Sequence, residues 1–400
     1  MNGGVTGGRG GDSIRVSSRD GLIQSLSVRG PAILLIADTI ALNGGERLPV
    51  NASNITIMGE GGTAMIRNGG LLILGNNVIL QNLSIGDSYI DGHWDGKGNP
   101  GADCLSLYGK NIWVDHCELF HGFDGLLDVS GSHGTAADYI TVSWTHFRDH
   151  NKVMLIGSND RQTYARGHLR VSIHHCWFDG HSRFYDAVDG VTYNLTQRMP
   201  RVRFGDVHVY NNYYEQIASY CIAARLESDV VAEYNYFRNL QNPHIIEDEG
   251  RGLEDPDLVA RGNIYENVKG RKDENGTAFD PLEHYSYSCD KVETIPALVM
   301  NGAGKWDRKC NNPPIALNDV YRVNDKKNSL NPLDNDSDPD GDNIRISRIL
   351  NDPAGETLVY PDRIIYYRPD DAEPPDTIAY EVIDFEGGVS VGMIEIVNEK

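Results

Sequence analysis

Three arginines gather at one bend of a chain that is otherwise strongly acidic. Arg198, Arg201 and Arg203 flank Pro200, whereas the 400 residues together have a formal net charge of −21. Proline lacks a donor N–H and has a fixed φ, so Arg198 belongs at the start or edge of a strand. Cations held at such a bend can act as fixed charges on an anionic ligand. A solvated charge cluster is the alternative for any arginine triplet taken alone.

Three aspartates upstream supply the opposite charge. Asp103 and Asp124 are 21 residues apart, and Asp124 and Asp128 flank one turn. If the chain forms stacked coils, residues about one coil apart become neighbours on adjacent strands, ~4.8 Å apart. Converging carboxylates repel one another unless a cation neutralises them, and an all-oxygen ligand set favours Ca²⁺. Lys152 and Arg198 follow one and two coils later, so the sequence predicts a calcium site beside a basic stripe.

A repeated strand pattern predicts the coils that would bring these residues together. Short apolar strands recur, each followed by a polar turn that often contains Asn or His, with marker positions at Ile55, Val78, Ile112, Ile140, Val171, Val207, Val230 and Val259. The steps between markers run from 23 to 36 residues, which indicates stacked coils with variable loops. We therefore expect an all-β fold, with a right-handed parallel β-helix over residues 1–310 whose turn asparagines stack. A propeller would need strands in groups of four. A short helix over residues 20–26 would cap the N-terminal coil.

Composition excludes several other classes of protein. No run of eighteen apolar residues occurs in the sequence, so we expect no membrane span. The first residues lack an apolar signal core, which we interpret as a mature or trimmed form of a secreted protein. The six cysteines have no CxxC spacing, which argues against zinc. Cys289 and Cys310 flank one polar segment and are candidates for a disulfide, whereas the other four are expected to be buried thiols.

The composition changes at residue 311, where Asn-Asn-Pro-Pro begins a second domain. Residues 313–400 contain 19 Asp and Glu against 8 Lys and Arg, a net of −11, which leaves −10 for the remaining 312 residues. Regular short strands and Gly-containing turns predict a small antiparallel β-sandwich, which resembles the cadherin-like and Ig-like modules of secreted bacterial proteins. The acidic run 335–342 is either a Ca²⁺ site or a solvated loop. Its charge would repel a polyanion, so we do not expect this module to bind an acidic substrate.

Four motifs in the first domain resemble those of the pectate lyase family of parallel β-helix polysaccharide lyases. They are Trp113-Val-Asp-His, Asp124-Gly-Leu-Leu-Asp, His150-Asn-Lys-Val-Met-Leu-Ile-Gly and Arg198-Met-Pro-Arg-Val-Arg-Phe-Gly, and the resemblance covers roughly residues 5–270. The chain departs from the family in the stretch 179–196, which looks expanded and includes Arg183, Tyr185, Asp186 and Asp189. We expect this stretch to form an additional wall of the cleft.

The resemblance implies a role for each charged residue. The implied calcium ligands are Asp103, Asp124 and Asp128. The implied base is Arg198, with Lys152 as the alternative base. The implied substrate-binding cations are Lys152, Arg201 and Arg203.

These roles imply a calcium-dependent pectate lyase that cleaves α-1,4-polygalacturonate by β-elimination and leaves unsaturated oligogalacturonides. A free guanidinium keeps its proton to above about pH 12, and neighbouring cations favour its neutral form, so we expect an alkaline rate optimum. The alternatives are a pectin lyase acting on methyl-esterified chains, which has no need for three calcium-binding carboxylates, and a non-catalytic β-helix adhesin. A hydrolase of this fold would leave the arginine motif unexplained. We expect a secreted monomer whose partner is polygalacturonate, with neither nucleic acid nor membrane as a partner.

Overall fold

The computed structural model describes residues 4–88, 103–181, 184–186, 191–247, 255–306, 312–339, 341, 343–369, 376–384 and 388–398. The chain divides into two compact units, one of residues 1–180 with 193–307 and one of residues 181–192 with 308–400. Residues 181–192 of the expanded stretch thus group with the second unit, and within the stretch β19 (Phe184–Asp186) pairs with β20 (Val191–Tyr193). The side chains of Arg183, Tyr185, Asp186 and Asp189 lie outside the described residues. The domain limits 1–310 and 313–400, and the role of the stretch as a cleft wall, stay predictions.

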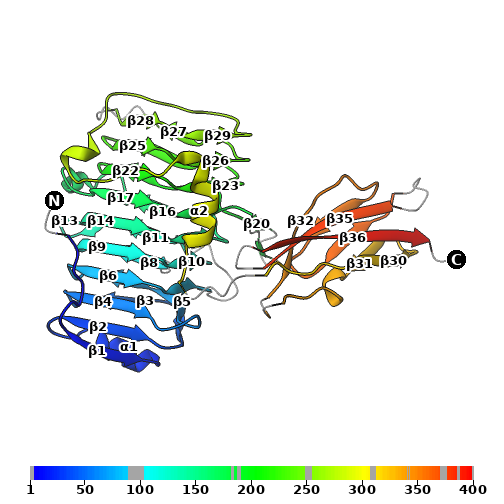
Figure 1. Cartoon of the computed structure of the whole chain (residues 1–400), viewed down its shortest axis with the longest axis horizontal. Coiled ribbons are helices and arrows are strands. Elements are labelled where there is room, and N and C mark those ends of the chain that lie inside the picture. The colour runs from blue at the N-terminus through cyan, green and yellow to red at the C-terminus, as the bar shows by residue number, and fades with distance from the viewer. Residues whose placement is uncertain are drawn as a thin grey trace. The chain divides into compact units, whose positions relative to one another are not determined.

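The first unit is a right-handed parallel β-helix, as expected, and Figure 1 shows its strands stacked from β1 to β28. One parallel sheet contains, in spatial order, β1 (Asp12–Val16), β2 (Ala32–Ile36), β4 (Ile55–Gly59), β6 (Val78–Gln81), β9 (Lys110–Asp115), β14 (Asp138–Ser143), β17 (Val171–His174), β22 (Asp206–Tyr210), β25 (Asp229–Glu233) and β28 (Asp257–Arg261). This ten-stranded sheet forms one side of every coil.

A second sheet of the β-helix has two strips that meet at β5 (Met65–Ile73). The first strip contains β8 (Leu105–Leu107), β11 (Leu127–Val129), β16 (Met154–Ile156), β21 (Arg201–Arg203), β24 (Ile222–Arg225) and β27 (His244–Ile246). The second strip contains β7 (Ser84–Gly86), β10 (Glu118–Phe120), β15 (His146–Arg148), β18 (Trp177–Asp179), β23 (Tyr213–Glu215), β26 (Tyr236–Arg238) and β29 (Ile264–Glu266), while β3 (Thr39–Val50) pairs with β5. The first strip, called the cleft strip below, positions most of the charged residues.

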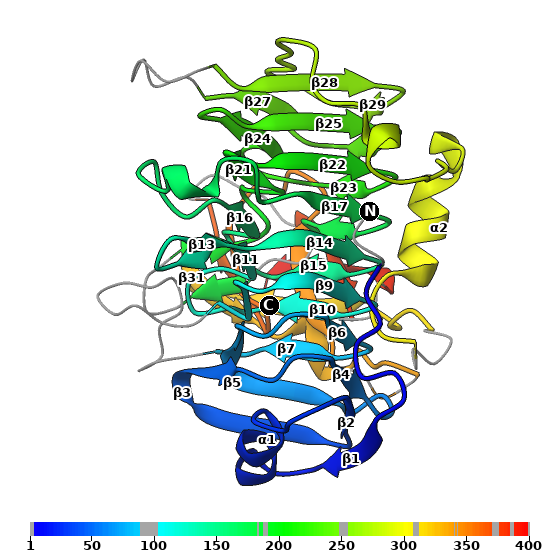
Figure 2. The same ribbon diagram turned by 90° about the vertical axis from the view of Figure 1, so that its left-hand side faces the viewer.

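Smaller elements complete the first unit. They are α1 (Arg19–Ser25), the hairpin β12 (Gly131–Ser132) with β13 (Thr135–Ala136), η1 (Thr163–Ala165), η2 (Pro281–Glu283), η3 (Val292–Thr294) and α2 (Ile295–Gly302). The expected cap helix is thus confirmed, with bounds shifted by one residue, and the Ser18 hydroxyl caps its N-terminus by accepting from Gly21 N. Figure 2 shows α2 alongside the stack of coils. Among the described residues, no helix is long and apolar enough to cross a membrane.

The register of the ten-stranded sheet follows the predicted markers. The pairs are Ile55–Val78, Val78–Ile112, Ile112–Ile140, Ile140–Val171, Val171–Val207 and Val207–Val230. The last marker is wrong by one residue, because Val230 pairs with Leu258 and Val231 pairs with Val259. Each inward aliphatic side chain thus stacks on its counterpart one coil away, and burying each stabilises the fold by ~1.5–3 kcal/mol.

Two further ladders hold the coils together. Inside the core, Phe147, Phe178, Tyr214, Phe237 and Tyr265 stack successively, with ring centroids 4.5 to 5.4 Å apart. At the turns the expected asparagine stacking is confirmed. Asn77 Nδ2 donates to Asn54 Oδ1 at 2.8 Å, and an equivalent ladder links Asn212, Asn235 and Asn263. These amides satisfy turn backbone groups that the strands leave unpaired, such as Cys176 N, which donates to Asn212 Oδ1.

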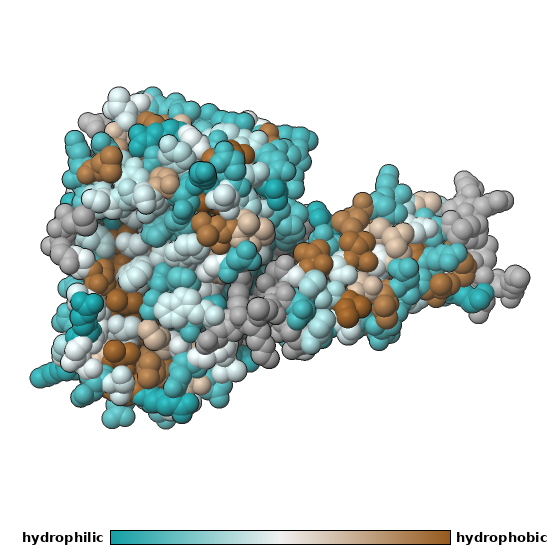
Figure 3. All heavy atoms as spheres, viewed as in Figure 1, coloured by the Kyte–Doolittle hydropathy of each residue, from teal (hydrophilic) through white to brown (hydrophobic). Residues whose placement is uncertain are grey.

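The second unit is a small β-sandwich, as expected. One sheet contains β30 (Asp319–Val323), β36 (Val389–Asn398), β35 (Asp376–Ile383) and β32 (Arg345–Ile349), and the other contains β31 (Lys327–Leu330), β34 (Ile364–Tyr367) and β33 (Glu356–Val359), with η4 (Pro332–Asp334) between strands. The pairs are antiparallel except for β30 with β36. Its core is separate from that of the β-helix and includes Ile346, Ile364 and Tyr380. In Figure 3 the hydrophobic groups on the visible face of this unit are scattered among hydrophilic ones.

The cysteines behave as expected in all but one respect. Cys104, Cys117, Cys176 and Cys221 are buried thiols. The expected disulfide of Cys289 is wrong for this structure, since Cys289 is a free thiol whose sulfur lies 3.9 Å from Glu233 Oε1. Cys310 itself lies outside the described residues.

Candidate active site

Two of the three predicted aspartates converge on the backbone of Gly125. Asp103 lies two residues before the start of β8, and Asp128 lies on the neighbouring strand β11. Asp103 accepts a hydrogen bond from Gly125 N at 3.0 Å through Oδ1 and another from the Ser106 hydroxyl at 2.8 Å through Oδ2. A Cβ added to Gly125 would lie 3.1 Å from Asp103 Oδ1 and 3.6 Å from Asp128 Oδ1. The absence of a side chain at Gly125 therefore leaves the space between the two carboxylates open.

These carboxylates repel one another. Burial is the largest cause of the raised pKa of Asp103, and the charge of Asp124 raises it further. The pKa of Asp128 lies well above its usual value, first because of burial and then because of Asp103 and Asp124, while Arg198 opposes the shift. A cation bound between the carboxylates would remove this repulsion, and all of their donor atoms are oxygen, so the set fits Ca²⁺.

Asp124 does not join the other two. Its side chain is 52% exposed, and Oδ1 accepts from Lys152 Nζ at 2.8 Å. Within the described part of the chain, no group of three Asp, Glu, His or Cys side chains is arranged to hold a metal ion as it stands. The ion pair with Lys152 accounts for this, because it engages the third carboxylate.

Lys152 and the turn around Asp124 are held by the neighbouring coil. Lys152 forms a parallel β-bridge with Gln197, which places it directly beside the arginine motif. His150 Nε2 lies 2.9 Å from the Asp124 carbonyl oxygen, so this nitrogen must carry the proton and donate it. Burial lowers the pKa of His150 to about 4, which keeps the ring neutral. A neutral histidine thus fixes the backbone of Asp124, whose side chain pairs with Lys152.

Arg198 lies near Asp128, three residues before the start of β21. Its charge acts on Asp128, its side chain hydrogen-bonds the Tyr220 hydroxyl, and its carbonyl accepts from Met154 N at 2.6 Å. Among the described residues its buried Nε has no hydrogen-bond partner. The backbone at Arg198 has φ of +66°, a left-handed conformation that costs an L-residue ~1–2 kcal/mol. A strained arginine with an unsatisfied buried nitrogen is a feature that often marks functional sites.

The other two arginines of the motif are held by acidic partners. Arg203 is 7% exposed, and it donates to Asp160 Oδ1 at 2.7 Å and to the Gly157 carbonyl at 3.1 Å. Arg201 is more accessible and pairs with Glu247 at 2.6 Å. Burial, followed by the charges of neighbouring arginines, lowers the pKa of Arg203. Arg201 and Arg203 are therefore fixed cations in the wall beside Arg198.

Three further charged residues that contact Arg201 and Arg203 were not predicted from the sequence. Arg225 pairs with Arg203 across β21 and β24, lies within 3.6 Å of Asp160 and 3.4 Å of Glu247, and is almost fully buried. The spacing of 22 residues between Arg203 and Arg225, about one coil, was the available signal. Asp160 and Glu247 lie in loops outside the strand pattern, so the period did not reveal them.

Comparison with known proteins identifies the family. Residues 45–305 match the family model described as pectate lyase. The chain belongs to the pectate lyase family. Residues 311–397 match the bacterial Ig domain model, so the expected Ig-like module is confirmed as well.

Curated relatives agree with this assignment. The chain is 31% identical over 319 residues to a pectate trisaccharide-lyase from Bacillus licheniformis, which covers 76% of this chain and 84% of that protein. It is 32% identical over 311 residues to a probable pectate lyase B from Aspergillus terreus, covering 75% of this chain and 86% of that protein. The expected enzyme class, pectate lyase, is thus confirmed.

Solved structures share the fold. A Bacillus pectate lyase in complex with trigalacturonate superposes with a TM-score of 0.61 at 24% identity, over 76% of this chain and 97% of that chain. Pectate lyase II from Xanthomonas campestris pv. campestris gives a TM-score of 0.59 at 23% identity, over 76% and 96% of the two chains. Both support the parallel β-helix.

Proposed function

We propose that this member of the pectate lyase family cleaves α-1,4-polygalacturonate by calcium-dependent β-elimination and releases unsaturated oligogalacturonides. The observation that carries the proposal is the placement of Arg198 beside the buried carboxylates Asp103 and Asp128. The relatives named as pectate trisaccharide-lyases, and the related enzyme crystallised with trigalacturonate, support the substrate class. Secretion and a monomeric state stay predictions.

The calcium requirement rests on the three aspartates. Asp103, Asp124 and Asp128 would hold the ion, and Asp124 would exchange its partner Lys152 for it. Bound Ca²⁺ would neutralise the substrate carboxylate and stabilise the enolate-like charge that develops when the α proton leaves. Lys152, released from Asp124, would then be free to pair with a carboxylate of the substrate. The chain thus uses one lysine in two successive ion pairs.

The proton transfer rests on Arg198. In β-elimination the C5 proton passes to the base, the electrons of the C–H bond form the C4–C5 double bond, and the C4–O bond breaks with the glycosidic oxygen as leaving group. Arg198, in its neutral form, would take the proton, since its side chain lies near Asp128 and its Nε has no partner among the described residues. Arg201 and Arg203 would bind substrate carboxylates as fixed cations, Arg201 being the more accessible of the two. We retain Lys152 as the alternative base.

The direct test follows product formation by ultraviolet absorbance, which detects the new double bond. Polygalacturonate and a highly methyl-esterified pectin are each supplied with calcium and then with excess chelator. We expect turnover of polygalacturonate only when calcium is present. Full activity after exhaustive chelation would contradict the calcium assignment and favour the pectin lyase alternative. Sugar binding with no unsaturated product would favour the adhesin.

A further inference from the structure

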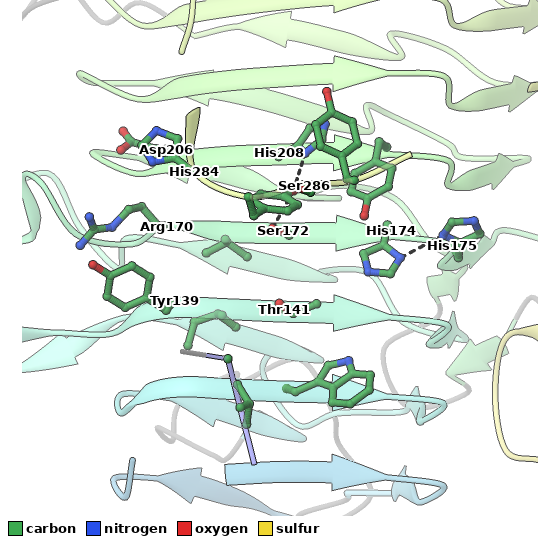
Figure 4. A pocket seen from close by; sticks show the side chains of 18 of the residues that line it. Tyr139, Thr141, Arg170, Ser172, His174, His175, Asp206, His208, His284 and Ser286 are labelled. Carbon is green, nitrogen blue, oxygen red and sulfur yellow. Dashed lines mark hydrogen bonds between the residues drawn. The ribbon is translucent and has the colours of Figure 1, made fainter. Parts of the chain in front are cut away.

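A cavity of about 760 Å³ lies on the outer face of the ten-stranded sheet, away from the cleft strip. Side chains of β9, β14, β17 and β22 form its floor, and the segment 279–290, called the strap below, crosses over it (Figure 4). Its volume is within the range of small-molecule sites, ~300–1,000 Å³. None of the residues assigned above to calcium, base or substrate binding lines it. The cavity is therefore a separate feature of the same β-helix.

Hydrogen bonds fix the strap in place, so the cavity is preformed. The Tyr285 hydroxyl lies 2.9 Å from Ser172 Oγ and 2.5 Å from His208 Nδ1. Further along, the Tyr287 hydroxyl donates to Glu233 Oε1 at 2.5 Å, and Asp290 N donates to Asn211 Oδ1 at 2.8 Å. A preformed cavity loses little conformational entropy when it binds a ligand.

The hydrogen-bond partners at one side of the strap determine which atom donates the proton in each bond. Glu233 Oε1 lies 3.0 Å from His208 Nε2, so this nitrogen donates, and burial lowers the pKa of His208, which keeps the ring neutral. His208 Nδ1 must then accept the Tyr285 proton, and the Tyr285 oxygen must accept the proton of Ser172. The lone pairs of Ser172 Oγ therefore stay available as acceptors at the cavity floor.

A second series of hydrogen bonds also ends in an available acceptor, at the other side of the cavity, where Figure 4 shows His174 and His175. The Asp290 carboxylate lies 2.9 Å from His175 Nε2, so this nitrogen donates. His175 Nδ1 then accepts from His174 Nδ1 at 2.9 Å. Burial first, then the neighbouring His175, lowers the pKa of His174 to about 3, so its ring is neutral and Nε2 is a bare acceptor. Among the described residues, Nε2 of His174 has no hydrogen-bond partner.

An aromatic face lies beside these acceptors. Trp113, Thr141, Ser172 and His208 form one row across four adjacent strands, all lining the cavity. The Trp113 indole is held at its edge, because Nε1 donates to Ser143 Oγ at 2.8 Å, and its ring is partly exposed. The Thr141 hydroxyl has no hydrogen-bond partner in the described part of the chain. The row thus offers a flat apolar ring next to a free hydroxyl and an acceptor oxygen.

The charges around the cavity exclude an acidic ligand. Among its described lining residues Arg170 alone is a lysine or arginine, and its Nε is bound to Asp138 Oδ1 at 2.9 Å. Asp206 and Asp290 contribute carboxylates to the lining instead. A uronate carboxylate would find no unengaged cation here, in contrast to the cleft. The lining instead matches a ligand with an apolar ring face and several hydroxyl donors.

We propose that this cavity binds an uncharged pyranose sugar. One face of the sugar packs on Trp113, and its hydroxyls donate to Ser172 Oγ and His174 Nε2 and bond with Thr141. A neutral hexose and a methyl-esterified galacturonate unit share this chemistry. The site does not depend on the proposed lyase reaction, because it is argued from the cavity alone, and it would let the enzyme bind a neutral part of a polysaccharide while the cleft engages an acidic part.

The test measures binding rather than turnover, with the full chain. Methyl α-D-galactopyranoside, the methyl ester of methyl α-D-galactopyranosiduronic acid and the corresponding free acid are each titrated and followed by saturation-transfer NMR. We expect both uncharged sugars to bind more tightly than the free acid. Trp113→Ala should weaken binding at least tenfold, and Thr141→Val, a nearly isosteric change, by roughly threefold to tenfold.

Two controls separate this site from other parts of the chain. Trp306→Ala removes an indole that is 50% exposed and lies outside the cavity lining, and Arg198→Ala disables the cleft, so both should bind the sugars as the wild type does. If Trp113→Ala fails to fold by circular dichroism, Thr141→Val decides alone. The proposal is overturned if neither uncharged sugar binds, if the folded cavity variants bind like the wild type, or if the free acid binds best. It is also overturned if Arg198→Ala abolishes the binding, since the sugar would then occupy the cleft.

Discussion

The cleft strip and the cavity face of the β-helix handle charge in opposite ways. In the cleft, Asp103 and Asp128 are buried side by side with raised pKa values, and Arg198 Nε is buried without a partner among the described residues. On the cavity face, Arg170 is bound to Asp138 and His208 to Glu233. The two faces belong to different sheets of the same β-helix.

The difference shows what each surface is suited to bind. Unsatisfied buried charge is costly, and it persists where a charged ligand or ion compensates for it. A polar network whose arginine is paired and whose histidines are neutral presents hydroxyl and imidazole acceptors, which suit a neutral ligand. Variants on either face should remove this difference in charge pairing or make it measurable.

Replacing the unpaired arginine should have the largest effect. Arg198→Ala should lower kcat by at least ~10²–10⁴-fold, because a general base contributes about that much, while calcium and substrate binding stay largely intact. Arg198→Lys should fail too, since its geometry and basicity differ. The measurement is the initial rate of unsaturated product formation with polygalacturonate.

A matched control is Arg166→Ala, which removes a surface guanidinium paired with Glu227 and should leave the rate near normal. Near-normal kcat in Arg198→Ala, together with its loss in Lys152→Ala, would exchange the roles of the two residues.

Removing one buried carboxylate should abolish the response to calcium. The folded-state pKa of Asp128 is raised, so its ionised form destabilises the metal-free protein above that pKa. Asp128→Asn should therefore raise the Tm in chelator by a few degrees and remove the further rise that calcium gives the wild type. Scanning calorimetry with calcium and with chelator measures both. A calcium-induced rise of wild-type size in the variant would place the ion elsewhere.

A carboxylate on the ten-stranded sheet should show a smaller, calcium-independent effect. Asp229 stacks between Asp206 and Asp257, and burial, followed by repulsion from both, raises its pKa to about 6. Its folded pKa lies above its unfolded one, so its contribution to stability is present below about pH 4 and is lost as pH rises through 6. The wild type should thus lose ~1–3 kcal/mol relative to Asp229→Asn between pH 4 and pH 7.

Urea denaturation of both proteins at each pH tests this, and parallel stability profiles would contradict it. Asp229→Asn should keep the calcium response that Asp128→Asn loses, which makes it the counterpart on the other sheet.

Deleting residues 313–400 should have the smallest effect on either face. The four motifs lie between residues 113 and 205, and the two units have separate cores, so KM for polygalacturonate should change less than about twofold. Residues 181–192 group with the deleted unit, so local changes should be confined to that stretch. A much higher KM with unchanged melting would show that the module reaches the substrate, and aggregation would show that it covers part of the β-helix.

The coils could be predicted from sequence because strand alternation is a local property. The markers from Ile55 to Val230 pair as expected, since each is a buried aliphatic residue that directly follows a polar or aromatic one. The prediction slips at Val259 because Leu258, Val259 and Ala260 are all apolar, so alternation no longer says which side chain points inward. The sequence could place Asp103, Asp128, Lys152 and Arg198 near one another because they lie on or close to consecutive strands of the cleft strip.

The rest depends on contacts that no local pattern encodes. The cavity exists because the strap crosses the sheet, and Tyr285 meets Ser172 across 113 residues of sequence. Asp160 and Glu247 reach the arginines from loops of irregular length, so neither spacing nor residue type indicated their role.

Coil length and strand register are independent in this chain. From Ile55 to Val230 the coils vary from 23 to 36 residues while every ladder pair is kept. A turn can therefore gain or lose residues without shifting any neighbour, and the sides of the coil can be altered separately. An engineer, or natural selection, could then lengthen one loop over the cleft to recognise a new polymer and leave the opposite side of the molecule unchanged.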